Sequence, residues 1–248
     1  MKNIHNFRDI GGYKNIEGKQ FRKGLIFRSG KLDNASKEEI DFLKSLGLKT
    51  IIDFYPQNRQ RRNPGKFIED KKINLPVPVD EANKEMLKPL LKKKNAEQEI
   101  IECANFFYTN MPDLMYDRIS EIFRILLKEE YYPVLFTCNM GKDRTGFIIA
   151  IIQWAVGIEK ETIIKEYLKT NDVYIPKARR ILKIIKFLSF GFIHAENYLT
   201  AFMIREKYLQ TVFERINKDY GGIEKYLESC EVSEKDIEIL KKILLEDY

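Results

Sequence analysis

The sequence is poor in the residue types that bind metals and build disulfides. Its 248 residues include only two histidines and three cysteines. Cys103, Cys138 and Cys230 are odd in number and widely spaced, which disfavours a disulfide framework and a Cys-x2-Cys zinc pattern. His5 and His194 alone make a histidine-based metal centre improbable. We therefore expect no metal and no cofactor, and a cysteine is free to be reactive.

Long apolar runs are also missing. No run approaches the roughly 18 residues of a membrane span, and the first residues lack the apolar core of a signal peptide. The composition, 44% hydrophobic and 32% charged, is that of a soluble globular protein. There is no internal repeat and no Pro- or Gly-rich linker. We expect a cytoplasmic protein with a single domain over residues 1–248.

Acidic residues are fewer than basic ones, so the formal net charge is +6. This surplus suits an anionic partner, although Lys-rich segments usually form solvated helix faces. Two basic clusters, at 92–94 and 177–180, are candidates for peripheral contact with a membrane or a phosphoinositide surface. Neither is interleaved with aromatic residues, so no nucleic-acid partner is expected. The pattern gives no indication of oligomeric state.

The most informative segment is the run CNMGKDRTG from Cys138 to Gly146. It lies between an apolar run at 134–136, typical of a short strand, and one at 147–152 that begins a helix pattern. Cys138 and Arg144 place a nucleophile and a bidentate phosphate clamp on one tight loop. The following helix N-terminus would favour a bound phosphate and a thiolate. A structural cysteine beside an unrelated turn is the alternative, and it requires the whole string to match by chance.

Three further motifs stand out elsewhere in the sequence: NFRDIGG at 6–12, FRSG at 27–30 and YGGIEKYL at 220–227. With the Cys138 loop, they resemble the bacterial branch of the protein tyrosine and dual-specificity phosphatases, whose members also dephosphorylate phosphoinositides. The resemblance runs nearly end to end. It departs at Thr137, where the family usually has His, at Asp53-Phe54-Tyr55 in place of Asp-Leu-Arg, and at Asn139, where the most basic loops have Lys.

The resemblance implies a metal-independent phosphomonoester hydrolase that forms a phosphocysteine intermediate. Its substrate would be a phosphorylated protein (phosphotyrosine, with phosphoserine or phosphothreonine also open) or a phosphoinositide. Thr137 motivates the alternative of a weak or inactive phosphate-binding pseudophosphatase.

The predicted catalytic residues are Cys138, Arg144 and Asp143, with Asp143 as the general acid. Asp143 could instead only shape the loop through a salt bridge, in which case Asp80 and Asp113 are the reserve acids. The residues predicted to bind substrate are Asn139, Met140, Gly141, Lys142, Thr145, Gly146 and Arg28.

Hydrophobic periodicity predicts an α/β fold with a central mixed, largely parallel sheet flanked by helices and a helix-rich C-terminal half. Strands are expected at 24–28, 48–54 and 133–137. Helices are expected at 36–46, 117–127, 145–156, 159–170, 175–189, 195–218 and 233–246. Residues 80–116 are the hardest to interpret. By resemblance they form a helical lid whose underside is the Phe106–Tyr108 aromatic cluster, and the alternative is a helix pair that buries these aromatics in the core.

Overall fold

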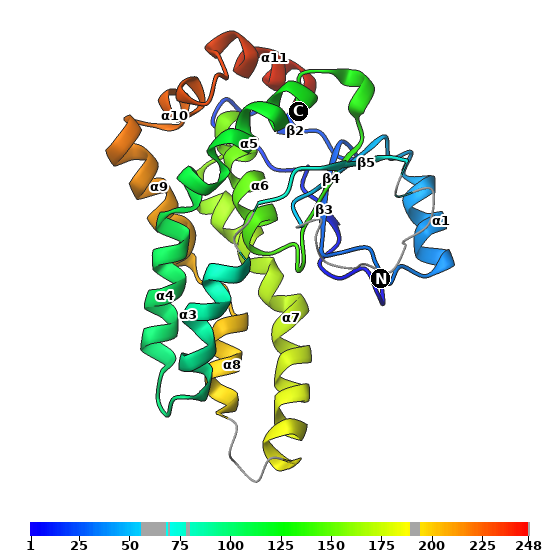
Figure 1. Ribbon diagram of the computed structural model, residues 1–248. Coiled ribbons are helices and arrows are strands. Elements are labelled where there is room, and N and C mark those ends of the chain that lie inside the picture. The colour runs from blue at the N-terminus through cyan, green and yellow to red at the C-terminus, as the bar shows by residue number, and fades with distance from the viewer. Residues whose placement is uncertain (56–67, 69, 78–79, 189–193, 248) are drawn as a thin grey trace.

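The computed structural model describes residues 1–55, 68, 70–77, 80–188 and 194–247, with the side chains of 80–84 and 185–188 left out. At its centre lies a five-stranded sheet in the order β1-β3-β6-β4-β5 (Figure 1). Strands β3 (Ile26–Ser29), β6 (Val134–Thr137), β4 (Thr50–Asp53) and β5 (Lys72–Asn74) run parallel, and β1 (Arg8–Asp9) is antiparallel to β3. The predicted α/β class with a mixed, largely parallel sheet is confirmed.

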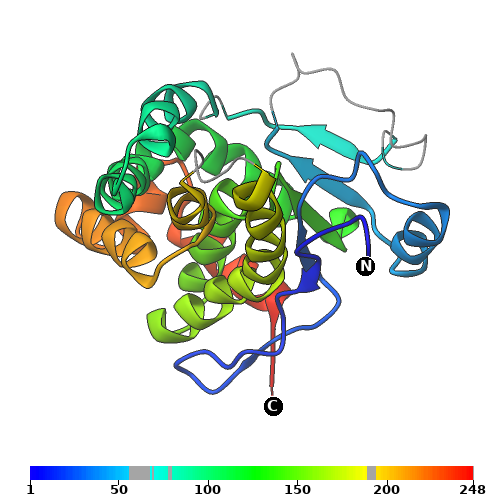
Figure 2. The same cartoon turned by 90° about the horizontal axis from the view of Figure 1, so that it is seen from below.

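The three middle strands are buried at every position, as expected for strands covered on both faces. Alternate side chains enter two separate cores. Phe27, Ile51 and Leu135 pack with helix α1 (Lys37–Ser45), whereas Ile52 and Phe136 belong to the larger core on the other face. Seen from below, α1 and the main helical mass lie on opposite sides of the sheet (Figure 2).

Helix α6 (Asp143–Ala155) runs directly from the phosphate-loop motif through the larger core and is buried along nearly its whole length. Helix α5 (Met111–Leu126) begins six residues earlier than expected and packs beside α6. The C-terminal elements α9 (Glu206–Tyr220), α10 (Ile223–Ser229) and α11 (Glu234–Leu244) complete this side. A short 3-10 turn (Glu129–Tyr131) precedes β6, and a small ladder joins β2 (Gln20–Phe21) to β7 (Leu245–Glu246).

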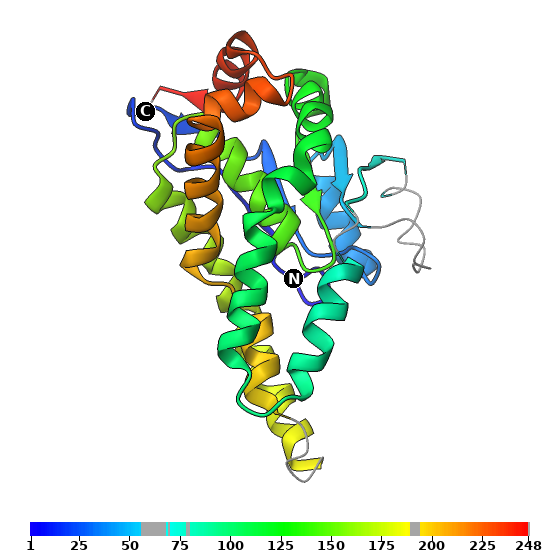
Figure 3. The same cartoon turned by 60° about the vertical axis from the view of Figure 1, so that its left-hand side comes forward.

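Four helices project from the sheet as an elongated bundle: α3 (Asp80–Lys92), α4 (Glu97–Thr109), α7 (Lys160–Leu188) and α8 (Ala195–Phe202) (Figure 3). The helices expected at 159–170 and 175–189 are one continuous helix, because Pro176 is accommodated inside α7. The helix expected over 195–218 is instead two helices, α8 and α9, divided at Met203–Arg205.

The aromatic cluster of the expected lid divides between core and surface. Tyr108 is 1% exposed and stacks on Tyr208 of α9, with ring centroids 4.9 Å apart. Phe107 is also buried, whereas Phe106 is 61% exposed. The core-packing interpretation therefore holds for two of the three aromatics, and a lid function for 80–116 stays a prediction.

Candidate active site

The CNMGKDRTG segment forms a loop at the carboxyl end of β6, the central strand of the sheet. Thr137 ends the strand, Cys138 follows it, and Asp143 begins α6 only five residues later. Cys138 is 3% exposed. The structure thus places Cys138 just after a buried strand and Arg144 in the first turn of the buried helix that follows.

Three successive carbonyl groups of this loop, at 139–141, are held by donors from outside it, and the fourth, at 142, is bonded within α6. Backbone N–H of Lys31 donates to Asn139 O at 3.2 Å, and the Tyr174 hydroxyl donates to Met140 O at 2.6 Å. Gly141 O accepts two bonds, which are described below, and Lys142 O accepts from Gly146 N–H at 2.9 Å.

The direction of these bonded carbonyl groups determines where the loop N–H groups point. In a planar trans peptide the N–H is opposite to the C=O of the preceding residue. Carbonyls fixed outward at 139–141 therefore direct the N–H groups of 140–142 toward the inside of the loop. Such convergent N–H groups at a helix N-terminus form an anion-binding concavity.

Two glycines make the loop sterically feasible. Gly141 has φ +60°, and a Cβ there would lie 2.2 Å from the carbonyl oxygen of Ser29. A Cβ on Gly146 would lie 2.8 Å from the ring of Tyr167. Both predicted site glycines therefore serve close backbone packing around the loop.

A buried ionic network anchors Gly141 from behind. Arg28 Nη2 and Asn6 Nδ2 each donate to Gly141 O at 2.7 Å. Glu166 of α7 accepts from Arg28 Nη1 at 2.9 Å and from Arg8 Nε at 2.6 Å. The NFRDIGG and FRSG motifs thus meet at one carboxylate behind the phosphate loop.

Burial and the neighbouring positive charges have opposite effects on the pKa of Glu166. Burial by itself would raise the pKa of Glu166, but Arg28 and Arg8 outweigh burial and hold that pKa below its ordinary value. Burial and the neighbouring Arg28 lower the pKa of Arg8 to about 10. Arg28 is fully buried, so its placement fits a supporting role better than the predicted contact with substrate.

Thr137, the departure from the usual His, is also part of the scaffold. Its hydroxyl donates to Gly30 O at 2.8 Å and so joins the ends of β6 and β3 just before the nucleophile. Thr145 lies in the first turn of α6 and is fully buried. Its hydroxyl oxygen has no partner among the described residues, which leaves it free to bond a thiolate or phosphate.

The two charged residues that begin α6 are held in different ways. Arg144 Nη1 donates to the carbonyls of Phe54 at 2.8 Å and Val77 at 3.2 Å, which orients the guanidinium. Asp143 Oδ1 accepts from the Tyr108 hydroxyl at 2.6 Å, and that hydroxyl accepts from Tyr167 at 2.5 Å. Burial and the Asp143 carboxylate raise the pKa of Tyr108, so Tyr108 keeps its proton and donates it.

Lys142 faces Asp143 and the end of helix α8. Its Nζ lies 3.6 Å from Asp143 Oδ1 and donates to Ala201 O at 3.3 Å. A cation at a helix C-terminus is favourable for the helix dipole. Lys142 therefore joins the projecting bundle to the loop and adds to its positive field.

Of the two reserve acids, the structure places only Asp113 away from this arrangement. Asp113 forms an ion pair with Arg215 of α9 at 3.1 Å. Asp80 begins α3, and its side chain lies outside the described residues. Asp143 is thus the carboxylate that the described structure places in the loop.

Sequence reasoning missed Glu166, Tyr108, Tyr167 and Tyr174. All four are on helices, where a single charged or aromatic residue looks like an ordinary amphipathic position. The spacing of Glu166, Tyr167, Thr170 and Tyr174 along one face of α7 is the only local signal, and it does not indicate what the face contacts.

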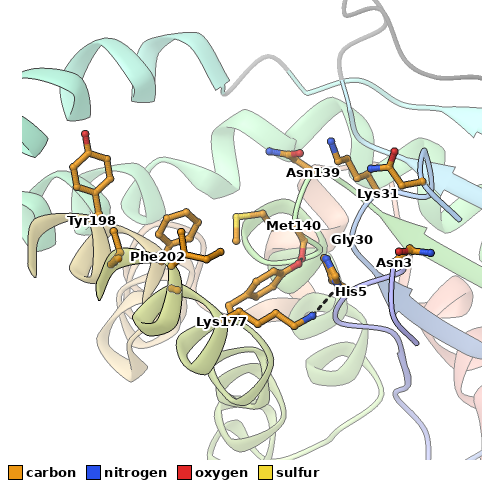
Figure 4. Close-up of a pocket in the computed structure, with 14 residues that line it drawn as sticks. Asn3, His5, Gly30, Lys31, Asn139, Met140, Lys177, Tyr198 and Phe202 are labelled. Carbon is orange, nitrogen blue, oxygen red and sulfur yellow. Dashed lines mark hydrogen bonds between the residues drawn. The ribbon is translucent and has the colours of Figure 1, made fainter. Parts of the chain in front are cut away.

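A cavity of about 500 Å³ adjoins the loop (Figure 4). Asn139 and Met140 line its middle, helices α7 and α8 line one side, and residues including Asn3 and His5 line the other (Figure 4). In the part of the chain that the structure describes, no three His, Cys, Asp or Glu side chains gather as a metal site. Among the same residues, no helix is long and apolar enough to cross a membrane.

An α/β sheet with a cysteine-and-arginine anion loop after its central strand defines a phosphatase-type site. The model of the tyrosine phosphatase family matches residues 1–246, and the chain belongs to this family. It is therefore a phosphoric monoester hydrolase.

Individual relatives cover most of the chain. A putative tyrosine-protein phosphatase of Cupriavidus necator is 25% identical over 233 residues, 90% of this chain and 80% of that protein. The triple specificity protein phosphatase PtpB of Mycobacterium tuberculosis is 26% identical over 271 residues, 97% of this chain and 96% of that protein. The inositol diphosphatase DSP2 of Arabidopsis thaliana is 30% identical over 139 residues, 52% of each. Among solved structures, the core catalytic domain of the S. cerevisiae PP-IP phosphatase SIW14 is 21% identical, with TM-score 0.39 over 60% of this chain and 74% of that chain.

Proposed function

We propose that this phosphatase works without a metal, through a covalent phosphocysteine on Cys138. The observation that carries the proposal is the loop whose carbonyls are held outward at 139–141, because this arrangement turns N–H groups toward a phosphate beside the thiol. The names of the relatives support a phosphorylated protein or an inositol phosphate as the substrate.

In the first step the Cys138 thiolate attacks phosphorus, and the bond from phosphorus to the ester oxygen breaks. The guanidinium of Arg144 binds equatorial oxygens of the transferring group, as a planar fork can and an ammonium cannot. Asp143 donates a proton to the departing oxygen. In the second step water attacks the phosphocysteine, Asp143 takes up a proton, and phosphate and thiolate are released. The Thr145 hydroxyl, which has no partner among the described residues, is proposed to stabilise that thiolate.

The covalent step is tested with p-nitrophenyl phosphate in the presence of EDTA. We expect turnover by the wild type and none by Cys138→Ser, which should still bind phosphate or vanadate. Cys103→Ser is the matched control, because burial raises the pKa of the Cys103 thiol and keeps it protonated. Inhibition by the chelator, or a wild-type rate in Cys138→Ser, would show the mechanism to be wrong.

The role of Asp143 is tested separately by leaving-group dependence. A general acid matters most when the departing oxygen is basic. Asp143→Asn should therefore slow a phosphotyrosine peptide far more than p-nitrophenyl phosphate. An equal loss for both substrates would mean that Asp143 only shapes the loop.

A further inference from the structure

We propose that the cavity beside the phosphate loop is a trough for one extended apolar chain, so that the substrate class includes single-chain alkyl or prenyl phosphates. This inference rests on the proposed function of the same site. It concerns the organic group of the substrate, which the phosphate-binding loop itself does not specify.

The trough is continuous with the phosphate loop. Asn139 and Met140, the two residues after Cys138, line its middle, between Phe202 of α8 and Asn3 near the N-terminus (Figure 4). Tyr174 lies in the same part, because its hydroxyl donates to Met140 O. Burial and the neighbouring Cys138 raise the pKa of Tyr174, consistent with a ring close to the nucleophile. A phosphate bound in the loop would therefore place its ester group in the part of the trough that Met140 and Tyr174 line.

The wall of the trough is elongated and apolar. Its side chains follow one stripe of α7 and one of α8: Tyr174, Ala178, Ile181, Leu182, Tyr198 and Phe202. The α7 stripe has the spacing i, i+4, i+7, i+8, so it runs for about 12 Å along the helix at 1.5 Å per residue. The volume of about 500 Å³ is much more than one aromatic ring needs.

The apolar wall of the trough favours some of the substrates that a phosphatase could accept over others. An inositol ring or a peptide backbone would bring polar groups against the α7 and α8 wall, and each group left without a hydrogen bond is costly. A hydrocarbon chain needs no such partners. Polar residues also line the cavity: Asn3, His5 and Lys31 lie on the side away from Tyr198 and Phe202, and Lys177 of α7 reaches His5 at 3.1 Å (Figure 4). The two lysines favour the phosphate end of the ligand.

Two isoleucines on α7 provide a matched pair for the test. Ile181 lines the trough and is 56% exposed, whereas Ile184, one turn further on, is 57% exposed and does not line it. A charge at either position leaves the core intact. A charge at 181 faces the proposed chain, and a charge at 184 does not.

The experiment measures kcat/KM for ethyl, butyl, hexyl and octyl phosphate, all below the concentrations at which they aggregate. Because each buried methylene contributes about 0.8 kcal/mol, we expect kcat/KM to rise by about two- to fourfold for each one. Ile181→Glu should lower the octyl-to-ethyl ratio at least tenfold, and Ile184→Glu should leave it unchanged. Calorimetric binding of octyl phosphate to Cys138→Ser gives a second measurement that needs no turnover.

Three results would overturn the trough. The first is a flat chain-length series in protein that hydrolyses p-nitrophenyl phosphate, which would leave the proposed function intact. The second is an equal effect of Ile181→Glu and Ile184→Glu, which would indicate adsorption on exposed apolar surface. The third is a higher kcat/KM for inositol phosphate or a leucine-flanked phosphotyrosine peptide than for octyl phosphate. Absence of all turnover, with octyl phosphate still bound by the Cys138→Ser protein, would instead refute the proposed function alone.

Discussion

Glu166 is the residue whose change tests most directly how the phosphate loop is supported. Its carboxylate is 1% exposed and bonds Arg28 at 2.9 Å and Arg8 at 2.6 Å. Glu166→Gln keeps the shape but removes the charge, which leaves two guanidinium groups without their counter-ion. Breaking one side of a buried ion pair typically costs about 3–5 kcal/mol. An amide oxygen can still accept a hydrogen bond, so we expect the lower half of that range.

The loss should appear in both stability and catalysis. Arg28 also holds Gly141 O, so a displaced Arg28 would release one of the carbonyls that orient the loop. We expect a lower free energy of unfolding in urea at pH 7 and a lower kcat/KM for p-nitrophenyl phosphate. The control is Glu214→Gln, because Glu214 pairs with Lys207 at 3.2 Å on the surface and such pairs contribute about 0.2–1 kcal/mol.

The same residue gives the variant a distinct pH dependence. The pKa of Glu166 is lower in the folded protein than its ordinary value of 4.5, because Arg28 and Arg8 outweigh burial. Its contribution to stability is therefore fully present above about pH 4.5 and is lost as the pH falls through the folded pKa. Glu166→Gln should lack this part of the acid sensitivity. If Glu166→Gln costs no more than Glu214→Gln at pH 7, the buried network does not support the loop.

Three further predictions concern single sites. Gly141→Ala should abolish activity, because its Cβ would lie 2.2 Å from a backbone oxygen. Gly47 has a similar positive φ, but nothing lies within 4 Å of a Cβ there, so Gly47→Ala should keep activity and lower the free energy of unfolding in urea by only about 1–2 kcal/mol. Tyr108→Phe removes the hydrogen-bond donor to Asp143 and should lower the free energy of unfolding by about 1–3 kcal/mol. It should also slow hydrolysis of a phosphotyrosine peptide more than hydrolysis of p-nitrophenyl phosphate, and equal rate losses would contradict a positioning role. Burial opposes ionisation of Glu39, but backbone N–H donors lower its pKa to about 2. Its contribution to stability should therefore be lost as the pH falls from about 4.5 to 2. Glu39→Gln should remove this part of the pH dependence of stability, as measured by acid unfolding.

The catalytic loop could be predicted from sequence because its parts are contiguous. Cys138 and Arg144 belong to one tight turn between a strand and a helix, so local periodicity is enough to place them. The three central strands were visible for the same reason, since strands buried on both faces appear as short continuous apolar runs. The sheet-edge strand β1 has two residues and no apolar pattern, and it was not predicted.

What the sequence did not reveal depends on contacts between distant segments. Glu166 follows Arg28 by 138 positions, and Tyr108 precedes Asp143 by 35. The sequence predicts a break between two helices at 171–174, just before Pro176, and a proline usually interrupts a helix. In the structure α7 continues past Pro176 alongside α8, so tertiary packing outweighs the local preference.

The way in which the loop is held separates phosphate binding from substrate choice. Asn139 and Met140 are fixed through their backbone carbonyls, by Lys31 N–H and the Tyr174 hydroxyl. Their side chains face the trough instead. Under the proposed function, a change of side chain at 139 or 140 would therefore alter the group that the phosphatase accepts while the N–H groups proposed to bind phosphate keep their orientation. The departure from Lys to Asn at 139 is of this kind: it removes a cation from the lining of the cavity, which on this proposal makes the site less suited to a second phosphate and more suited to an uncharged chain.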